Sequence, residues 1–153
     1  MNRPNIRHAS LSLALAVLIF APACRRSSPL ELEKTPAQRV AVYNGVLAES
    51  VRGTTETAIT LERSGVLTRA QVLQVLDYTE RVAKTSKAVA IIQQTPGDWA
   101  VRAPQIRTVL NSISPPGDFA RWLSATPAEA KVLSALLDAI QATITILIRE
   151  VSK

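Results

Sequence analysis

A threonine opens each of three long segments, at Thr35, Thr68 and Thr126, and this repeated signal constrains the fold more than any other feature. A glutamine or glutamate stands three residues after each threonine, which is the pattern of a capping box at a helix N-terminus. Proline also follows Thr35 and Thr126, and proline is favoured at the first position of a helix. The sequence therefore predicts three long helices that begin at these threonines.

Apolar residues recur at spacings of three and four behind the first two caps, which is typical of one buried helix face. The first series contains Val40, Tyr43, Leu47, Val51, Thr54, Ala58 and Leu61, and it ends at Ser64-Gly65. The second contains Val72, Val75, Thr79, Val82, Ser86, Val89 and Ile92, and it ends at Thr95-Pro96-Gly97. Because the connection between them is short, we expect these two helices to be antiparallel neighbours.

The third segment is the most apolar, since Asp138 is its only charged residue between positions 132 and 148. A helix with so wide an apolar face usually lies at the centre of its bundle. A face left open for a partner or a membrane is the alternative. A spanning helix is not favoured, because Asp138, Gln141 and three hydroxyl residues interrupt the run.

The middle of the chain is irregular and rich in proline. Pro104 is expected to open a short helix, and a second short helix is expected from about Asp118 to Ser124. No alternating run bounded by hairpin turns indicates a strand. The sequence therefore predicts an all-α fold, a small helical bundle of three long helices and two short ones.

The N-terminal segment has the three parts of a secretory signal peptide. Arg3 and Arg7 form a positive start, residues 9–20 carry no charge, and Ala21-Pro22-Ala23 supplies small residues for cleavage. The apolar run is well under the roughly 20 residues that span a bilayer. We therefore expect a signal peptide over residues 1–23, a flexible tether over 24–34 and the helical bundle domain over 35–153.

Cys24 is the only cysteine and directly follows this small-residue site. The sequence Ala21-Pro22-Ala23-Cys24 resembles the lipobox of bacterial lipoprotein precursors, although Ala21 stands where leucine is usual. The resemblance implies that Cys24 is acylated and holds the protein to a membrane. Arg25, rather than aspartate, follows the cysteine, which implies an outer-membrane lipoprotein facing the periplasm. Ordinary cleavage, which leaves a soluble periplasmic or secreted protein with a free thiol, is the alternative.

The composition argues against several functions. After loss of Arg3 and Arg7, sixteen basic residues stand against twelve acids, a formal charge of +4. These basic residues are scattered, whereas a nucleic-acid footprint is clustered. His8, the only histidine, lies in the signal, and no metal-ligand spacing, glycine-rich phosphate loop or nucleophile elbow is present. We therefore expect no enzyme activity, no cofactor, no metal and no nucleic-acid partner.

Other polar residues have a structural interpretation. Asp77 with Arg81, and Glu80 with Lys84, have the spacing of ion pairs on a solvated helix face. A basic ligand surface at Arg81, Lys84 and Lys87 is the alternative. Threonines of the first helix are expected to pack or to bond back to helix carbonyls, and both tyrosines to lie in the core with a hydrated hydroxyl. These threonines and tyrosines are Thr54, Thr55, Thr57, Thr60, Tyr43 and Tyr78.

One short motif occurs twice: Pro96-Gly97-Asp98-Trp99-Ala100 and Pro116-Gly117-Asp118-Phe119-Ala120. Structurally, each aspartate caps a helix and each aromatic residue packs against the core. The alternative is a surface for a glycan or lipid formed by Asp98, Trp99, Arg102, Asp118, Phe119 and Trp122. A pair of glycosidase carboxylates at Asp98 and Asp118 is a further, weaker alternative. The favoured function is a non-enzymatic interaction or structural role in the cell envelope, with an envelope protein as partner.

Overall fold

The computed structural model describes residues 34–115, 119 and 128–153, and these belong to one compact unit. It contains four α-helices, α2 (Pro36–Arg63), α3 (Arg69–Gln94), α4 (Trp99–Asn111) and α6 (Lys131–Glu150), and the 3-10 turn η2 (Ala128–Ala130). No strand occurs among the described residues, so the predicted all-helical class is confirmed. The predicted signal peptide, the tether up to residue 33 and the second short helix, apart from Phe119, lie outside them.

Both predicted capping boxes at the first two helices are present. Thr35 and Gln38 exchange hydrogen bonds between side chain and backbone at 3.3 and 2.8 Å, and Thr68 and Gln71 do the same at the start of α3. Gly65 ends α2 with a φ of 75°, a left-handed conformation that glycine adopts without the strain a Cβ would add. These two helices therefore begin and end where local signals predict.

Helix α4 begins earlier than the sequence predicts. It starts at Trp99, so Pro104 lies inside the helix instead of opening it. Proline removes the hydrogen bond that residue 104 would donate to the carbonyl of Ala100, and Ala100 is exposed to water, which can replace that bond. Burial of Ala103 and Ile106 on the inner face of α4 favours the continuous helix despite that loss.

Helix α6 begins later than the sequence predicts. The 3-10 turn η2 occupies residues 128–130, and the α-helix starts at Lys131. Ala130 stands at the N-cap position without a side-chain hydrogen bond. Tight 3-10 turns are frequent at helix ends. Thr126 and Pro127, the predicted cap and first residue, lie outside the described part of the chain.

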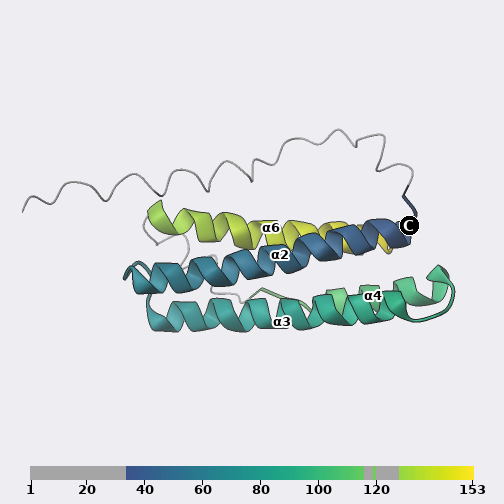
Figure 1. Cartoon of the computed structure of the whole chain (residues 1–153), viewed down its shortest axis with the longest axis horizontal. Coiled ribbons are helices and arrows are strands. Elements are labelled where there is room, and N and C mark those ends of the chain that lie inside the picture. The colour runs from purple at the N-terminus through teal and green to yellow at the C-terminus, as the bar shows by residue number, and fades with distance from the viewer. Residues whose placement is uncertain (1–33, 116–118, 120–127) are drawn as a thin grey trace, which may run out of the picture. The chain divides into compact units, whose positions relative to one another are not determined.

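The three long helices lie side by side, with α2 between α3 and α6 (Figure 1). Short α4 packs on α3 and also contacts α6. The five residues between α2 and α3 reverse the chain, so the expected antiparallel pair is confirmed. The prediction that the most apolar helix is central is wrong, because α2 packs against both other long helices.

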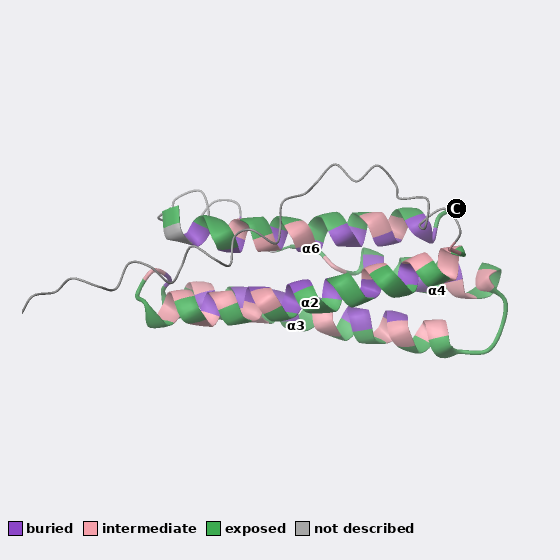
Figure 2. Ribbon diagram, turned by 45° about the horizontal axis from the view of Figure 1, so that its top comes forward, coloured by how far each residue is buried: buried purple, intermediate pink, exposed green. Residues whose placement is uncertain are grey.

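Each helix buries one stripe of side chains and exposes the opposite one (Figure 2). The inner residues of α6 are fully or almost fully buried, and they are Leu133, Leu137, Ile140, Ile144 and Leu147. Val132 remains 46% exposed, and Leu136, Ile146 and Ile148 are half-buried. The apolar surface of α6 is therefore wider than the face that the described bundle covers.

Candidate functional site

The first copy of the repeated motif lies at the corner between α3 and α4. Arg102 donates from Nη1 to the carbonyl oxygen of Gln93 at 2.6 Å and to that of Thr95 at 3.4 Å. Carbonyls in the last turn of a helix lack partners within it and carry partial negative charge, so a guanidinium there stabilises the helix end. Arg102 thus joins α4 to the C-terminus of α3.

The neighbouring residues of the motif point to the same structural role. Trp99 is half-buried and packs against the hydrophobic core. Asp98 is exposed and stands at the predicted N-cap position of α4, but its side chain makes no capping hydrogen bond. Asp98 is therefore the cap residue, as its place in the motif predicts, but the predicted hydrogen bond from a backbone N–H to its side chain is absent.

The second copy of the motif is represented by Phe119 alone, because Asp118 and Trp122 lie outside the described residues. Phe119 is only 4% exposed, and its ring meets that of Tyr78 edge to face with 5.5 Å between centroids. A buried ring cannot stack on a glycan, so the alternative that places Phe119 on a ligand surface is corrected. The structural interpretation of the motif fits Phe119, because its aromatic ring packs into the core.

The hydroxyl of Tyr78 departs from its prediction as well. Tyr78 is 1% exposed, and its hydroxyl finds no hydrogen-bond partner among the described residues. The expected hydrated hydroxyl is therefore wrong for this residue. Burial raises the pKa of Tyr78, and the nearby charge of Arg81 opposes that rise.

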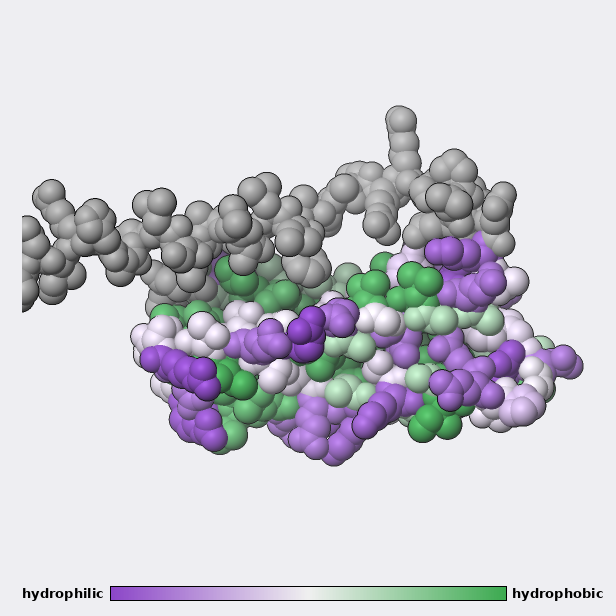
Figure 3. Space-filling model, viewed as in Figure 1, coloured by the Kyte–Doolittle hydropathy of each residue, from purple (hydrophilic) through white to green (hydrophobic). Residues whose placement is uncertain are grey.

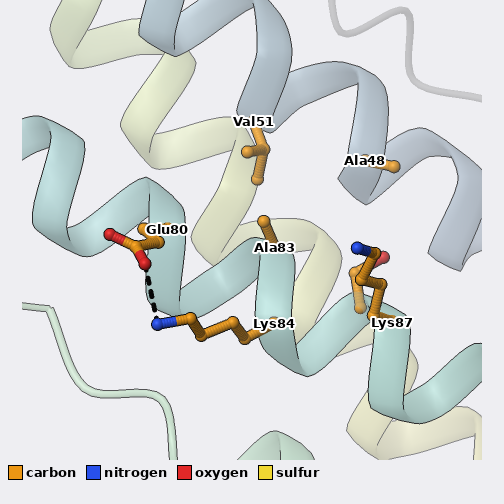
Figure 4. Close-up of a pocket in the computed structure, with 7 residues that line it drawn as sticks. Ala48, Val51, Glu80, Ala83, Lys84 and Lys87 are labelled. Atoms are coloured by element: carbon orange, nitrogen blue, oxygen red, sulfur yellow. Dashed lines mark ion pairs between the residues drawn. The ribbon is translucent and has the colours of Figure 1, made fainter.

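A shallow, open groove lies between α2 and α3 (Figure 4). Ala48, Val51 and Ala83 supply apolar or small side chains, and Glu80, Lys84 and Lys87 supply charged ones. A second hollow continues it along the helices through Thr55, Leu76 and Thr79. The groove offers an apolar strip with a charged edge, which suits contact with another surface better than enclosure of a small molecule.

The charged edge of this groove is mostly paired. Lys84 binds Glu80 at 2.7 Å, and Arg81 binds Asp77 at 3.1 Å, as the spacing predicts. The hydrogen bond from Lys84 lowers the pKa of Glu80, and Glu80 in turn raises the pKa of Lys84. Lys87 makes no ion pair with any described residue. Arg81 and Lys84 thus form the ion pairs that were predicted for a solvated helix face.

The threonines of α2 behave as expected. Thr54, Thr55 and Thr60 donate to helix carbonyls four residues earlier, at 2.7 to 2.9 Å. Thr55 also lies 3.2 Å from the hydroxyl of Thr79 on α3. Such bonds satisfy the hydroxyls inside the bundle and leave no activated nucleophile in this cluster.

A buried carboxylate at the end of α6 was not predicted. The Glu150 side chain is 5% exposed and accepts from Arg39 Nε and from Lys153 Nζ, each at 2.7 Å. Burial raises the pKa of Glu150, but the hydrogen bonds and charges of Lys153 and Arg39 outweigh it, so the pKa falls below its ordinary value. The available signal was an acid in the last turn of a helix, where the helix dipole disfavours it.

The described residues contain no group of three histidine, cysteine, aspartate or glutamate side chains placed to hold a metal ion. By length and composition, α6 is the one described helix able to cross a membrane. Core helices have the same character, and the inner face of α6 packs in the bundle. No protein-family model, curated protein or solved structure matches this chain.

Proposed function

We propose that this chain is an exported envelope protein, held to a membrane by an acylated Cys24, with a non-enzymatic interaction or structural role. The observation that carries the proposal is the position of the only cysteine. It follows Ala21-Pro22-Ala23 directly and precedes the Thr35 cap by eleven residues. A lone cysteine at this point, outside the bundle, suits an acyl attachment better than a disulfide.

The chemistry of the described bundle supports a role without catalysis. Glu150, Glu80 and Asp77 are engaged in ion pairs. The groove between α2 and α3 is open, and its polar groups are two lysines, a serine and a paired glutamate. These residues offer a surface for a partner, and they lack a nucleophile beside a base. An envelope protein is the partner class we favour.

The finer architecture belongs to the same proposal. Three long helices and one short one are described, and we place the second short helix near residues 118–124, around Phe119. We place the protein on the outer membrane, facing the periplasm, because Arg25 follows Cys24. Several acyl chains would give stable attachment, since a single chain binds a bilayer only marginally.

The decisive experiment is the intact mass of the protein purified from the membranes of its own cells. We expect the mass of residues 24–153 plus acyl groups. The Cys24→Ser variant should lose the acyl mass and leave the membrane fraction, whereas Ser27→Ala, a matched change in the tether, should keep both. An unmodified mass for residues 24–153 in the unaltered protein would refute the anchor and favour a diffusible protein.

A second candidate, a binder of glycan or lipid through the Trp99 and Trp122 region, has one favourable observation. Trp99 is half-buried, so part of its side chain is open to solvent, and Asp98, the preceding residue, is exposed. Tryptophan fluorescence during titration with envelope glycans tests it. A saturable change that Trp99→Phe abolishes supports this binder, and flat emission across the glycans removes it.

A further inference from the structure

The exposed face of α2 changes character halfway along the helix. Between Val40 and Glu49, every exposed residue is uncharged and apolar or small: Ala41, Val42, Gly45, Val46 and Ala48. From Glu49 onward the exposed positions carry charges, and Arg52 forms ion pairs with both Glu49 and Glu56. This apolar stretch lies in the N-terminal half of α2, the half nearer Cys24 in the sequence.

The neighbouring end of α3 continues this apolar half. Ile91 is 66% exposed, the highest value among the large hydrophobic residues of the described chain. Lys87, one turn earlier, lines the groove together with Ala48. Asn44 donates to the carbonyl oxygen of Ser86, and Gln93 donates to that of Ala37, so these turns of α2 and α3 are held side by side.

We call this surface the anchor-side face and define it by Ala41, Val42, Gly45, Ala48, Lys87 and Ile91. A Cβ placed on Gly45 would meet nothing within 4 Å, so no part of the described bundle covers the centre of the face. Figure 3 shows hydrophobic surface divided by charged groups on the side of the bundle where α2 lies in front. The face is therefore left open by the described bundle, mostly apolar and edged by Lys87, which makes no ion pair with another described residue.

We propose that the anchor-side face rests on the surface of the bilayer that holds Cys24, an inference that depends on the proposed acylation. The ten residues after Cys24 reach at most about 35 Å, and α2 is about 42 Å long. The apolar half of α2 lies at the tether end of that length, within reach of the headgroups when the bundle lies on its side. Val42 and Ile91 then enter the headgroup region, and Lys87 pairs with anionic lipid.

The competing occupant is a second copy of this chain. Small residues at 41, 45 and 48 permit close helix packing, but a self-contact would bring the positive Lys87 groups of both copies to one interface. A bilayer with anionic headgroups has the opposite charge. The charged half of α2, with Arg52 and Glu56, limits the apolar contact to the part of the helix nearer its N-terminus.

A position-specific quenching experiment tests this placement. Trp99 and Trp122 are first replaced with phenylalanine so that the added tryptophan is the sole emitter. The acylated protein is then purified from membranes as Ile91→Trp, reconstituted into vesicles of phosphatidylethanolamine and phosphatidylglycerol with brominated acyl chains, and its emission is compared with that in unbrominated vesicles. Two matched controls are Val101→Trp, 62% exposed at the same end but on α4, and Leu73→Trp, 50% exposed on the same helix away from the tether. Circular dichroism verifies that each variant folds.

We expect the added tryptophan at 91 to be quenched at least about twofold more than either control, because tryptophan settles at the membrane interface. Equal quenching at all three positions, in protein that carries acyl mass, overturns the placement and leaves the anchor intact. A blue-shifted but unquenched tryptophan at 91 also overturns it and identifies a second copy on this face. Absence of acyl mass overturns the proposed anchor, and this inference with it.

Discussion

Arg39, in the first turn of α2, donates from Nε to Oε2 of Glu150, the last residue of α6, at 2.7 Å. The contact joins residues 111 positions apart and closes the end of the bundle at which α2 begins. Gln93 holds the last turn of α3 to the same end through the carbonyl oxygen of Ala37. The first turn of α2 is thus bonded to α6 through the Arg39 side chain and to α3 through the Gln93 side chain, so the three long helices are joined at one end.

Replacing Glu150 with glutamine should lower the free energy of unfolding by about 1–3 kcal/mol, because Arg39 and Lys153 lose the charge of a buried partner. Urea unfolding followed by circular dichroism measures it. Glu49→Gln is the matched control, since Glu49 and Arg52 are both about two-thirds exposed and solvent screens their pair, so this change should have a much smaller effect. Equal effects in the two variants would contradict a structural role for the buried pair.

The contribution of Glu150 should depend on pH in one direction. Its pKa in the folded protein lies below the ordinary 4.5, so its contribution is present above that value and is lost as pH falls through the lowered pKa. The stability difference between the unaltered protein and Glu150→Gln should therefore be large near about pH 7 and should shrink as pH falls below 4.5. A difference that stays constant between these conditions would argue against the charged pair.

Replacing Arg102 with methionine should destabilise the protein by about 1–3 kcal/mol, because the carbonyl oxygens of Gln93 and Thr95 lose a charged donor. Thermal unfolding measures this loss. Arg107→Met, an exposed change on the same helix, should alter stability by less than about 0.5 kcal/mol. Should Arg102→Met leave stability intact and abolish binding of a glycan, the ligand role of Arg102 would replace the structural one.

Replacing Gly53 with alanine should raise the free energy of unfolding by about 0.5–1 kcal/mol, because Gly53 lies inside α2 and an added Cβ meets nothing within 4 Å. The same change at Gly65 should lower it by about 1 kcal/mol, since φ there is 75°. Guanidinium unfolding of both variants measures the two changes in the free energy of unfolding, which should have opposite signs. A loss of stability in Gly53→Ala would show that something outside the described bundle approaches that position.

Replacing Tyr78 with phenylalanine should leave stability unchanged or raise it by up to about 1 kcal/mol, because the buried hydroxyl has no partner among the described residues. Tyr78→Leu should be destabilising, since it removes the edge-to-face contact with Phe119. Thermal unfolding of the two variants separates the contribution of the hydroxyl to stability from that of the ring. Destabilisation of Tyr78→Phe by more than about 1 kcal/mol would mean that the hydroxyl is bonded.

Local signals made the first two helices predictable. The capping boxes at Thr35 and Thr68 and the stop at Gly65 involve residues at most a few positions apart, so sequence spacing alone describes them. The start of α4 was missed because a proline inside a helix is tolerated only when packing compensates, and packing is not a local property. The central position of α2 was missed for the same reason, since periodicity does not fix which faces meet.

For the site residues too, contacts within one helix were predictable and contacts between separate elements were not. The ion pairs of Arg81 and Lys84 follow from i,i+4 spacing within one helix and were predicted. The contacts of Arg102 with α3, of Phe119 with Tyr78 and of Glu150 with Arg39 join separate elements, and no spacing rule connects such partners. Burial of Phe119 was anticipated only by the structural interpretation of the repeated motif.

The fastening of α2 at its first turn has a mechanical consequence. A pull applied at Lys34 along the bundle would load α2 while Arg39 transfers part of the force to α6 and the carbonyl of Ala37 transfers part to α3. Three long helices would then resist in shear, with many contacts sharing the load. A first turn held on both flanks therefore suits a domain that would stay folded if a force reached it through Lys34.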